Sequence, residues 1–348
     1  MDRVSLYYPT IEIADIKWLK AALLYSDKVS SIFPFVDMTV PEVPRIVREL
    51  HDLGQYKPLM AYKILEAESQ EPTTDFKEFE STVLSIFDSD EFTNLTKNAQ
   101  NVEDESIIGL FRNKLTKPIY QKLLEKDLVG YPVTDVVAVN KVAYHVYMAL
   151  LARFLSRVSD DSVTPSSGDP YYENVSLFLG AKGVSVSRLI FDKCLPVPSE
   201  DISLGEIVEF KTQRMDELLR FRGVVDEVES KIRNAVNREQ LKEVMIAFTE
   251  RMVVELRELN KLLKDSKIKF ILSGFSSLID NETDLIGPVG AGLGSATLFN
   301  EPLIGLGVGA LSLALQTSSS LVKIRRNASS SSMSYLYFAR EAGIIPKR

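Results

Sequence analysis

The sequence predicts an α+β protein that is mostly helical, with a small N-terminal α/β sheet region, a long antiparallel helical hairpin and a glycine-rich helical C-terminal region. Three observations predict this class. Near the N-terminus, β-branched and aromatic runs alternate with helical periodicity. From residue 203, two long segments carry apolar residues at three- and four-residue spacing. Seven of the 17 glycines then fall within residues 285–321. We expect three regions, at 1–200, 203–267 and 268–348.

The composition excludes several classes of protein. Of the 348 residues, 45% are hydrophobic, which is too many for a disordered chain. A single cysteine, Cys194, excludes a disulfide scaffold and a cysteine-based metal centre, and two histidines leave little for a histidine-rich one. The net charge of −7 and a pI near 5.2 argue against a nucleic-acid partner. We expect no cofactor and no bound metal.

The N-terminal region is predicted to be a β-α-β unit. Residues 4–13 (VSLYYPTIEI) and 29–36 (VSSIFPFV) are rich in the residue types that favour strands. Asp15 can cap a helix that continues to about Tyr25. If the strands are parallel, the crossover should be right-handed. No basic segment followed by an apolar run opens the chain, so we expect no signal peptide and a cytoplasmic protein.

Two helices are predicted after this unit. The first begins at Pro41 or Pro44 and ends before Gly54, since proline suits the first turn of a helix and glycine its exit. The second lies within residues 66–106, which hold 12 acidic and two basic residues. Aromatic and aliphatic residues recur there at helical spacing, which predicts an acidic amphipathic helix. The recurring residues are Phe76, Phe79, Val83, Leu84 and Phe87.

A strongly apolar helix is predicted over residues 135–158, capped by Thr134 and central to the core. We expect His145, on this helix, to be a core histidine bonded to a backbone group. Residues 159–174 (SDDSVTPSSGDPYYEN) indicate a loop and a domain boundary. Residues 184–197 then predict one or two strands that return to the sheet.

The segment from 203 to 267 predicts the helical hairpin. Ser203 and Glu206 form a capping-box pattern, and a second start signal lies at residues 237–240. The two arms have similar lengths and evenly mixed charges, which favours a solvated antiparallel pair over one rod. A short last helix around Tyr335 is expected to dock onto the core.

The glycine-rich segment leaves three interpretations open. Its glycines recur with small-xxx-small spacing, which allows close approach of helix backbones. It can be a close-packed hairpin buried in the fold, or a membrane-active hairpin over 285–315 followed by a basic tail. It can also be a phosphate-binding loop, although its GxGxG spacing differs from the GxGxxG pattern of such loops. The candidate packing or interaction residues are Gly290, Gly294, Gly305, Gly309, Arg325 and Arg326.

The sequence contains only weak candidates for catalytic residues, because the motifs HExxH, GxSxG and CxxC are all absent. Glu12, Asp15 and Lys17 resemble a carboxylate-x-lysine set that holds Mg²⁺ for phosphodiester cleavage. Arg45 and His51 loosely match the arginine–histidine spacing of some helical ribonucleases. The alternative for the first set is an ordinary helix start, and for the second a surface helix of mixed charge.

Three stretches resemble a bacterial family known only as a domain of unknown function. They are LYYPTIEIADIKWLKAALLYSDKVSSIFP at 6–34, VEFKTQRMDELLRFRGVV at 208–225 and SMSYLYFAREAG at 332–343. The resemblance implies a likeness over the whole chain and a setting in bacterial stress or phage defence. It supplies no active residue.

The leading hypothesis is therefore a non-enzymatic interaction or regulatory protein that binds a protein partner or a second copy of itself. One alternative is a membrane-perturbing effector that releases the 285–315 hairpin. The other is a metal-dependent nuclease or nucleotide-processing enzyme whose acidic residues are dispersed along the chain.

Overall fold

The computed structural model describes residues 2–100, 107–130, 135–167, 197–234, 243–244, 247 and 331–345. The fold is α+β and mostly helical, as predicted. The chain divides into two compact units. The described part of the first, here called the sheet unit, lies within residues 2–16 and 26–167. That of the second, the helical unit, comprises residues 17–25 together with the described residues from 197 onward.

The sheet unit contains a parallel sheet with strand order β2-β1-β5. β1 (Arg3–Tyr7) pairs in parallel with β2 (Lys28–Ser31) on one side and β5 (Ser162–Ser166) on the other. Helix α1 (Ile16–Tyr25) separates β1 from β2 in the sequence, so the predicted β-α-β order is confirmed.

Three predictions about strand boundaries are wrong. β2 ends at Ser31 rather than at Val36. β1 ends at Tyr7 rather than Ile13, and Pro9, which has no N–H to donate to a ladder, follows directly after Tyr8. Residues 162–166, expected to be loop, form β5 because they pair with the central strand along its whole length. The turn-forming composition of this segment is compatible with an edge strand, where Pro165 is tolerated.

An antiparallel hairpin of β3 (Ile107–Phe111) and β4 (Val136–Asn140) leads into helix α7 (Lys141–Val158). The helix predicted from Thr134 therefore begins later than expected. Val137 and Val139 are buried and Ala138 is exposed, which is the period of a strand. The side chain of Asn140 caps α7 by accepting hydrogen bonds from the N–H groups of Val142 and Ala143, at 3.0 and 3.3 Å.

Helices form most of the rest of the sheet unit. They are α2 (Arg45–Asp52), α3 (Ala61–Gln70), α4 (Thr74–Asp88), α5 (Asp90–Gln100), the short 3₁₀ helix η1 (Arg112–Lys114) and α6 (Lys117–Glu125). The predicted limits of α2 are confirmed. It follows Pro44 and ends before Gly54, whose φ of +66° suits glycine and whose N–H donates to the carbonyl of His51 at 2.8 Å.

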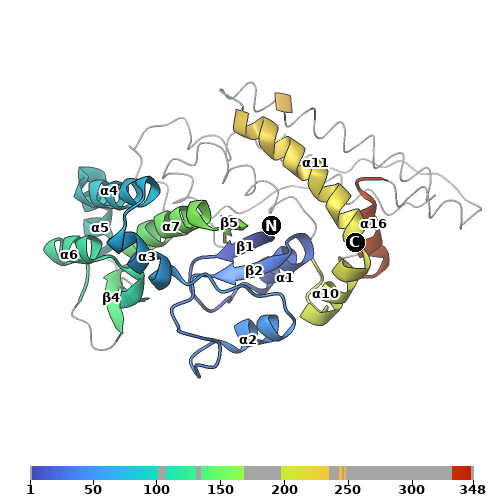
Figure 1. Ribbon diagram of the computed structural model, residues 1–348, viewed down its shortest axis with the longest axis horizontal. Coiled ribbons are helices and arrows are strands. Elements are labelled where there is room, and N and C mark those ends of the chain that lie inside the picture. Colours follow the sequence, from blue (N-terminus) through green and yellow to red (C-terminus); the bar gives the residue numbers. More distant parts are fainter. Residues whose placement is uncertain are drawn as a thin grey trace, which may run out of the picture. The chain divides into compact units, whose positions relative to one another are not determined.

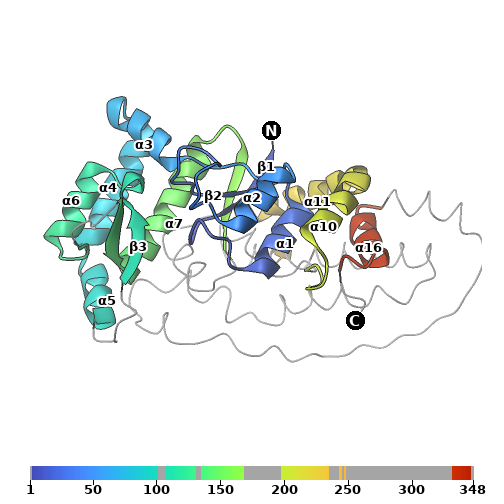
Figure 2. The ribbon, with the colours of Figure 1, turned by 90° about the horizontal axis from the view of Figure 1, so that it is seen from below.

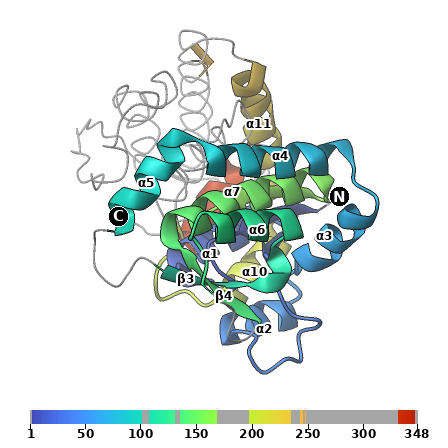
Figure 3. The same cartoon turned by 90° about the vertical axis from the view of Figure 1, so that its left-hand side faces the viewer.

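The core of the sheet unit is built around α7, whose residues 142–152 are all buried. α4 lies alongside α7 and α6 (Figure 1 and Figure 3). α4 is the predicted acidic amphipathic helix: Phe76, Phe79 and Phe87 are buried, while Asp75, Glu78 and Asp88 are exposed. The rings of Phe79 and Phe154 stack with centroids 4.8 Å apart, which joins α4 to α7.

The helical unit contains α1, α10 (Leu204–Gln213), α11 (Met215–Asn234) and α16 (Ser334–Glu341). The predicted capping box is present, since the Ser203 hydroxyl accepts from the Glu206 N–H at 3.2 Å and Glu206 accepts from the Ser203 N–H at 2.9 Å. The first arm of the hairpin was expected as one helix but is interrupted at Arg214. Most of the second arm, residues 184–196 of the strand segment predicted at 184–197, and the segment 285–321 lie outside the described residues.

α16 docks as predicted, beside α10 and α11 (Figure 2). The ring of Tyr335 lies 5.4 Å from that of Phe210 and 6.3 Å from that of Phe221. Its hydroxyl donates to the carbonyl of Leu24 at 2.7 Å, which ties α16 to α1. One buried tyrosine thus links three helices of this unit to α16.

Candidate functional site

The candidates in the glycine-rich segment and basic tail lie outside the described residues. They are Gly290, Gly294, Gly305, Gly309, Arg325 and Arg326. Within the described ranges, none of the helices is both long enough and apolar enough to cross a membrane.

The weak nuclease candidates do not form a metal site in the described part of the chain. Glu12 is exposed, and Lys17 pairs instead with Glu200 at 3.1 Å. Asp15 is partly buried and directly precedes α1. Where the structure describes the chain, no three His, Cys, Asp or Glu side chains are grouped so that they could hold a metal ion.

The arginine–histidine pair lies on α2. Arg45 is exposed, and His51 Nδ1 lies 3.7 Å from Asp52 Oδ1, with half of its side chain exposed. Six residues along a helix correspond to ~240° of rotation, so the two side chains project from different faces. α2 therefore has the arrangement of the surface-helix alternative.

The carboxyl ends of β1 and β2 are a second candidate region, because ligands of open parallel sheets bind beyond these ends. The carbonyl of Pro9, after β1, accepts a hydrogen bond from the hydroxyl of Tyr144. The carbonyl of Pro34, after β2, accepts one from Asn113 Nδ2 at 2.8 Å. The hydroxyl of Tyr147 donates to the carbonyl of Lys114. The bond from Asn113 joins η1 to the segment after β2, and the bond from Tyr147 joins η1 to α7.

Lys114, the last residue of η1, is a cation in the interior of the sheet unit. Only 3% of it is exposed, and its Nζ lies 5.8 Å from the ring centroid of Phe111. Its amine makes no ion pair or hydrogen bond with any residue that the structure describes. Burial lowers its pKa to about 7. An amine that is partly neutral near pH 7 can act as a base or a nucleophile. No sequence pattern marked Lys114, because its burial depends on how η1 packs.

His145 is buried in α7, as predicted, with 4% of it exposed. Burial and, to a smaller extent, the charge of Lys141 lower its pKa to about 3, while a backbone hydrogen bond at Lys141 opposes the shift. The imidazole therefore remains neutral at physiological pH, where so weak a base has little capacity to accept a proton.

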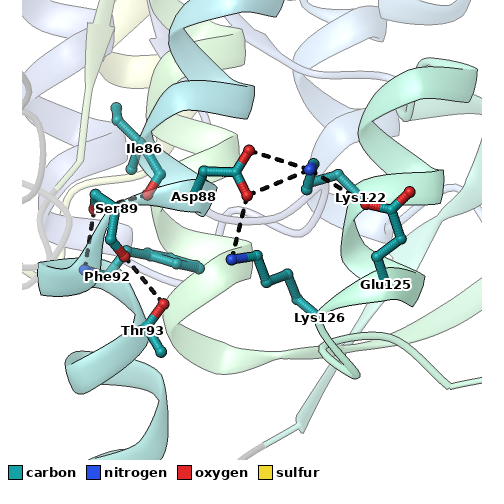
Figure 4. Close-up of polar contacts among 8 residues, drawn as sticks. All are labelled: Ile86, Asp88, Ser89, Phe92, Thr93, Lys122, Glu125 and Lys126. Atoms are coloured by element: carbon teal, nitrogen blue, oxygen red, sulfur yellow. Dashed lines mark hydrogen bonds and ion pairs between the residues drawn. The ribbon is translucent and has the colours of Figure 1, made fainter.

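A polar cluster on the surface of the sheet unit connects α4, α5 and α6 (Figure 4). The carboxylate of Asp88 lies 3.1 Å from Lys122 Nζ and 3.2 Å from Lys126 Nζ. The hydrogen bond from Lys122 and then that from Lys126 lower the pKa of Asp88. Ser89 caps α5 by accepting from the Phe92 N–H at 3.2 Å. Both lysines are bonded to the same carboxylate, so this cluster has the form of a structural clamp.

The helical unit presents an apolar strip on α11, here called the contact stripe: Met215, Leu219 and Gly223. Met215 is 36% and Leu219 55% exposed, and Gly223 is also exposed. The opposite face of α11 is buried, with Leu218 and Phe221 in the core of this unit. Residues four apart lie on one side of a helix, so the three stripe residues form a continuous strip.

The contact stripe differs from the other exposed apolar residues. The remaining large exposed hydrophobic residues of the described part are single and lie in separate segments of the chain: Ile16, Val36, Ile107 and Leu124. Single apolar residues are ordinary on protein surfaces, whereas a strip on one rigid helix is typical of a contact site.

Comparison with known proteins finds a match to a protein family. A family model described as a family of unknown function, DUF6236, matches residues 137–342. Neither the curated proteins nor the solved structures contain a match. Because the matched residues make up more than half of the 348, the chain belongs to the DUF6236 family of unknown function.

Proposed function

We propose that this protein is a non-enzymatic interaction or regulatory protein that works in the bacterial cytoplasm and binds another protein chain through the contact stripe. The observation that carries the proposal is the exposure of Met215 and Leu219 on one face of α11. Burial of an exposed leucine at an interface is worth roughly 1.5–3 kcal/mol when it is complete.

The construction of α11 supports a contact role. Its inner face is held by Leu218 and Phe221, so its outer face is presented on a fixed backbone. A rigid helix loses little conformational entropy when a partner binds, and more of the contact energy then contributes to affinity. Gly223 adds space for close approach, since a Cβ atom built there meets nothing within 4 Å.

The biological setting that we propose is stress response or phage defence. It is supported by the sequence resemblance of residues 6–34, 208–225 and 332–343, which implies such a setting. In that setting a protein can act by binding alone, as the proposed contact stripe requires.

A complementation experiment tests the proposed function. A strain that lacks the gene is complemented with the natural protein, with Leu219→Glu or with Leu124→Glu, and its survival under stress and phage challenge is measured. Leu124, 38% exposed on α6, is a matched control on the surface of the sheet unit. We expect Leu219→Glu to behave like the deletion and Leu124→Glu like the natural protein, at equal protein levels. Full complementation by Leu219→Glu would refute the proposal.

A further inference from the structure

We infer that the occupant of the contact stripe is the same stripe of a second copy of this chain, with the two α11 helices antiparallel and Leu219 at the two-fold axis. The inference rests on the proposed function, because it names the partner of the same surface. Three properties of α11 lead to it: the size order of the stripe residues, the charges beside them and the open space at Gly223.

The side chains of the contact stripe decrease in size from Met215 through Leu219 to Gly223, which suits an antiparallel pair. Met215 and Gly223 lie at equal distances on either side of Leu219, about 6 Å along the helix axis. A two-fold axis through Leu219 therefore places Leu219 against Leu219 of the second copy and the long side chain of Met215 against the exposed backbone of Gly223. The contact is self-complementary, as an interface around a two-fold axis must be.

The charges beside the stripe favour the same arrangement. Asp216 and Arg220 are both exposed and follow the stripe on one flank. In an antiparallel pair centred on Leu219, Asp216 of each copy lies near Arg220 of the other, which gives two equivalent pairs of opposite charge. A parallel pair would instead place the flank that carries Asp216 and Arg220 against the opposite flank of the second helix, so these pairs of opposite charge would not form.

The open space at Gly223 fits a close crossing of the helices. A side chain there would meet no atom of its own chain within 4 Å, so the fold does not require glycine at this position for lack of room. In a helix interior glycine is less favourable than alanine by about 1 kcal/mol. Close approach of a second backbone accounts for its presence.

The size of the contact predicts its strength. α11 has 20 residues and is about 30 Å long, so a pair of such helices buries less area than a tight dimer needs. We therefore expect weak, reversible dimers. The mass in solution is measured by sedimentation equilibrium of the full chain at concentrations of roughly 5 to 300 µM, which span the micromolar dissociation constants of weak complexes.

Two variants of the stripe and one control test the contact itself. Leu219→Glu should weaken the dimer at least about tenfold, because it places two like charges at the axis. Gly223→Leu should also weaken it without loss of folding, since the new side chain would stand between the two backbones. Leu124→Glu, on the sheet unit, should leave the mass curve unchanged.

Two charge variants test the antiparallel arrangement. Asp216→Arg and Arg220→Asp should each be monomeric alone, because each gives both flanking positions the same charge. Mixed with each other they should form a heterodimer: one chain then carries two positive charges beside its stripe and the other carries two negative charges, so both contacts between the helices join opposite charges. Charge pairing within one helix cannot produce that rescue.

Two results would overturn the inference. One is a natural chain that remains monomeric at the highest concentration, and the other is a dimer whose strength Leu219→Glu and the charge variants do not change. If either occurs while Leu219→Glu still fails to complement the deletion strain, the contact stripe binds a different protein and the proposed function stands. If Leu219→Glu complements fully, the proposed function fails whatever the state of association.

Discussion

Replacing the buried Lys114 with methionine should stabilise the sheet unit, and the gain should depend on pH. Methionine has an apolar side chain of similar length but no amine. Lys114 is only 3% exposed, so the change removes a charged group from the interior. The backbone carbonyl of Lys114, which accepts a hydrogen bond from Tyr147, is unaffected by the change.

The magnitude follows from the pKa of the amine. Burial lowers this pKa from 10.5 to about 7 in the folded protein. Between these two values the unfolded chain holds a proton that the folded chain does not, so the stability of the natural protein rises with pH across the window. At about 1.4 kcal/mol per pH unit, the cost of burying Lys114 is at most about 5 kcal/mol below pH 7 and disappears near pH 10.5.

The assay is urea unfolding followed by circular dichroism at three pH values from about 7 to about 9, below the range in which tyrosines ionise. We expect Lys114→Met to be several kcal/mol more stable than the natural protein at the lowest of these values, with the difference shrinking by about 1.4 kcal/mol per pH unit. Lys63→Met, at an exposed position of α3, is the control and should show no such trend. Parallel pH profiles for the natural and Lys114→Met proteins, or a loss of stability near neutral pH, would refute the reasoning.

Three other predictions concern packing, capping and surface charge. Gly109→Ala should cost about 1–3 kcal/mol in urea unfolding, because the new Cβ atom would lie 2.9 Å from Val136 Cγ1 on the neighbouring strand; an unchanged midpoint would contradict this packing. Ser203→Ala removes the capping box and should cost about 1 kcal/mol, with Ser203→Asp restoring most of it. Asp88→Asn should lower the melting temperature slightly at low salt and have no effect in about 1 M NaCl. The stabilising effect of Asp88 should be present above its ordinary pKa and be lost as the pH falls through its lowered value, so the Asn variant should lose this part of the acid transition.

Much of the local structure could be predicted from the sequence. The ends of α2, the capping box at Ser203 and the apolar face of α4 depend on residues within a few turns of each other, and all three are confirmed. The docking of Tyr335 was also predicted, because its neighbours Leu336, Phe338 and Ala339 are apolar.

The strand assignments were harder because strands need partners from distant parts of the chain. Residues 162–166 contain serine, threonine and proline, which are typical of a loop, but they pair with β1, about 160 residues away. Residues 136–140 were included in the following helix because their valines fit both periods. Pairing with β3 decides the strand, and the cap at Asn140 marks where the helix begins.

The candidate sites, too, combine features that the local sequence predicts with features that depend on distant contacts. The three- and four-residue spacing of apolar residues predicted that α11 has a buried face. It did not predict the exposure of Met215 and Leu219, because the spacing alone does not show which apolar residues another element covers. Lys114 gave no signal in the sequence, because its pKa depends on burial at η1 rather than on its neighbours in the chain.

The sequence by itself therefore determined the class of the fold, several helix limits and the likeness to a family of unknown function, because these depend on short-range periodicity, capping and residue order. Only the tertiary structure decided the partners of the central strand, the start of α7, the burial of Lys114 and the exposed strip on α11. Each of these depends on contacts between residues far apart in the chain, and such contacts produce no periodic pattern in the sequence.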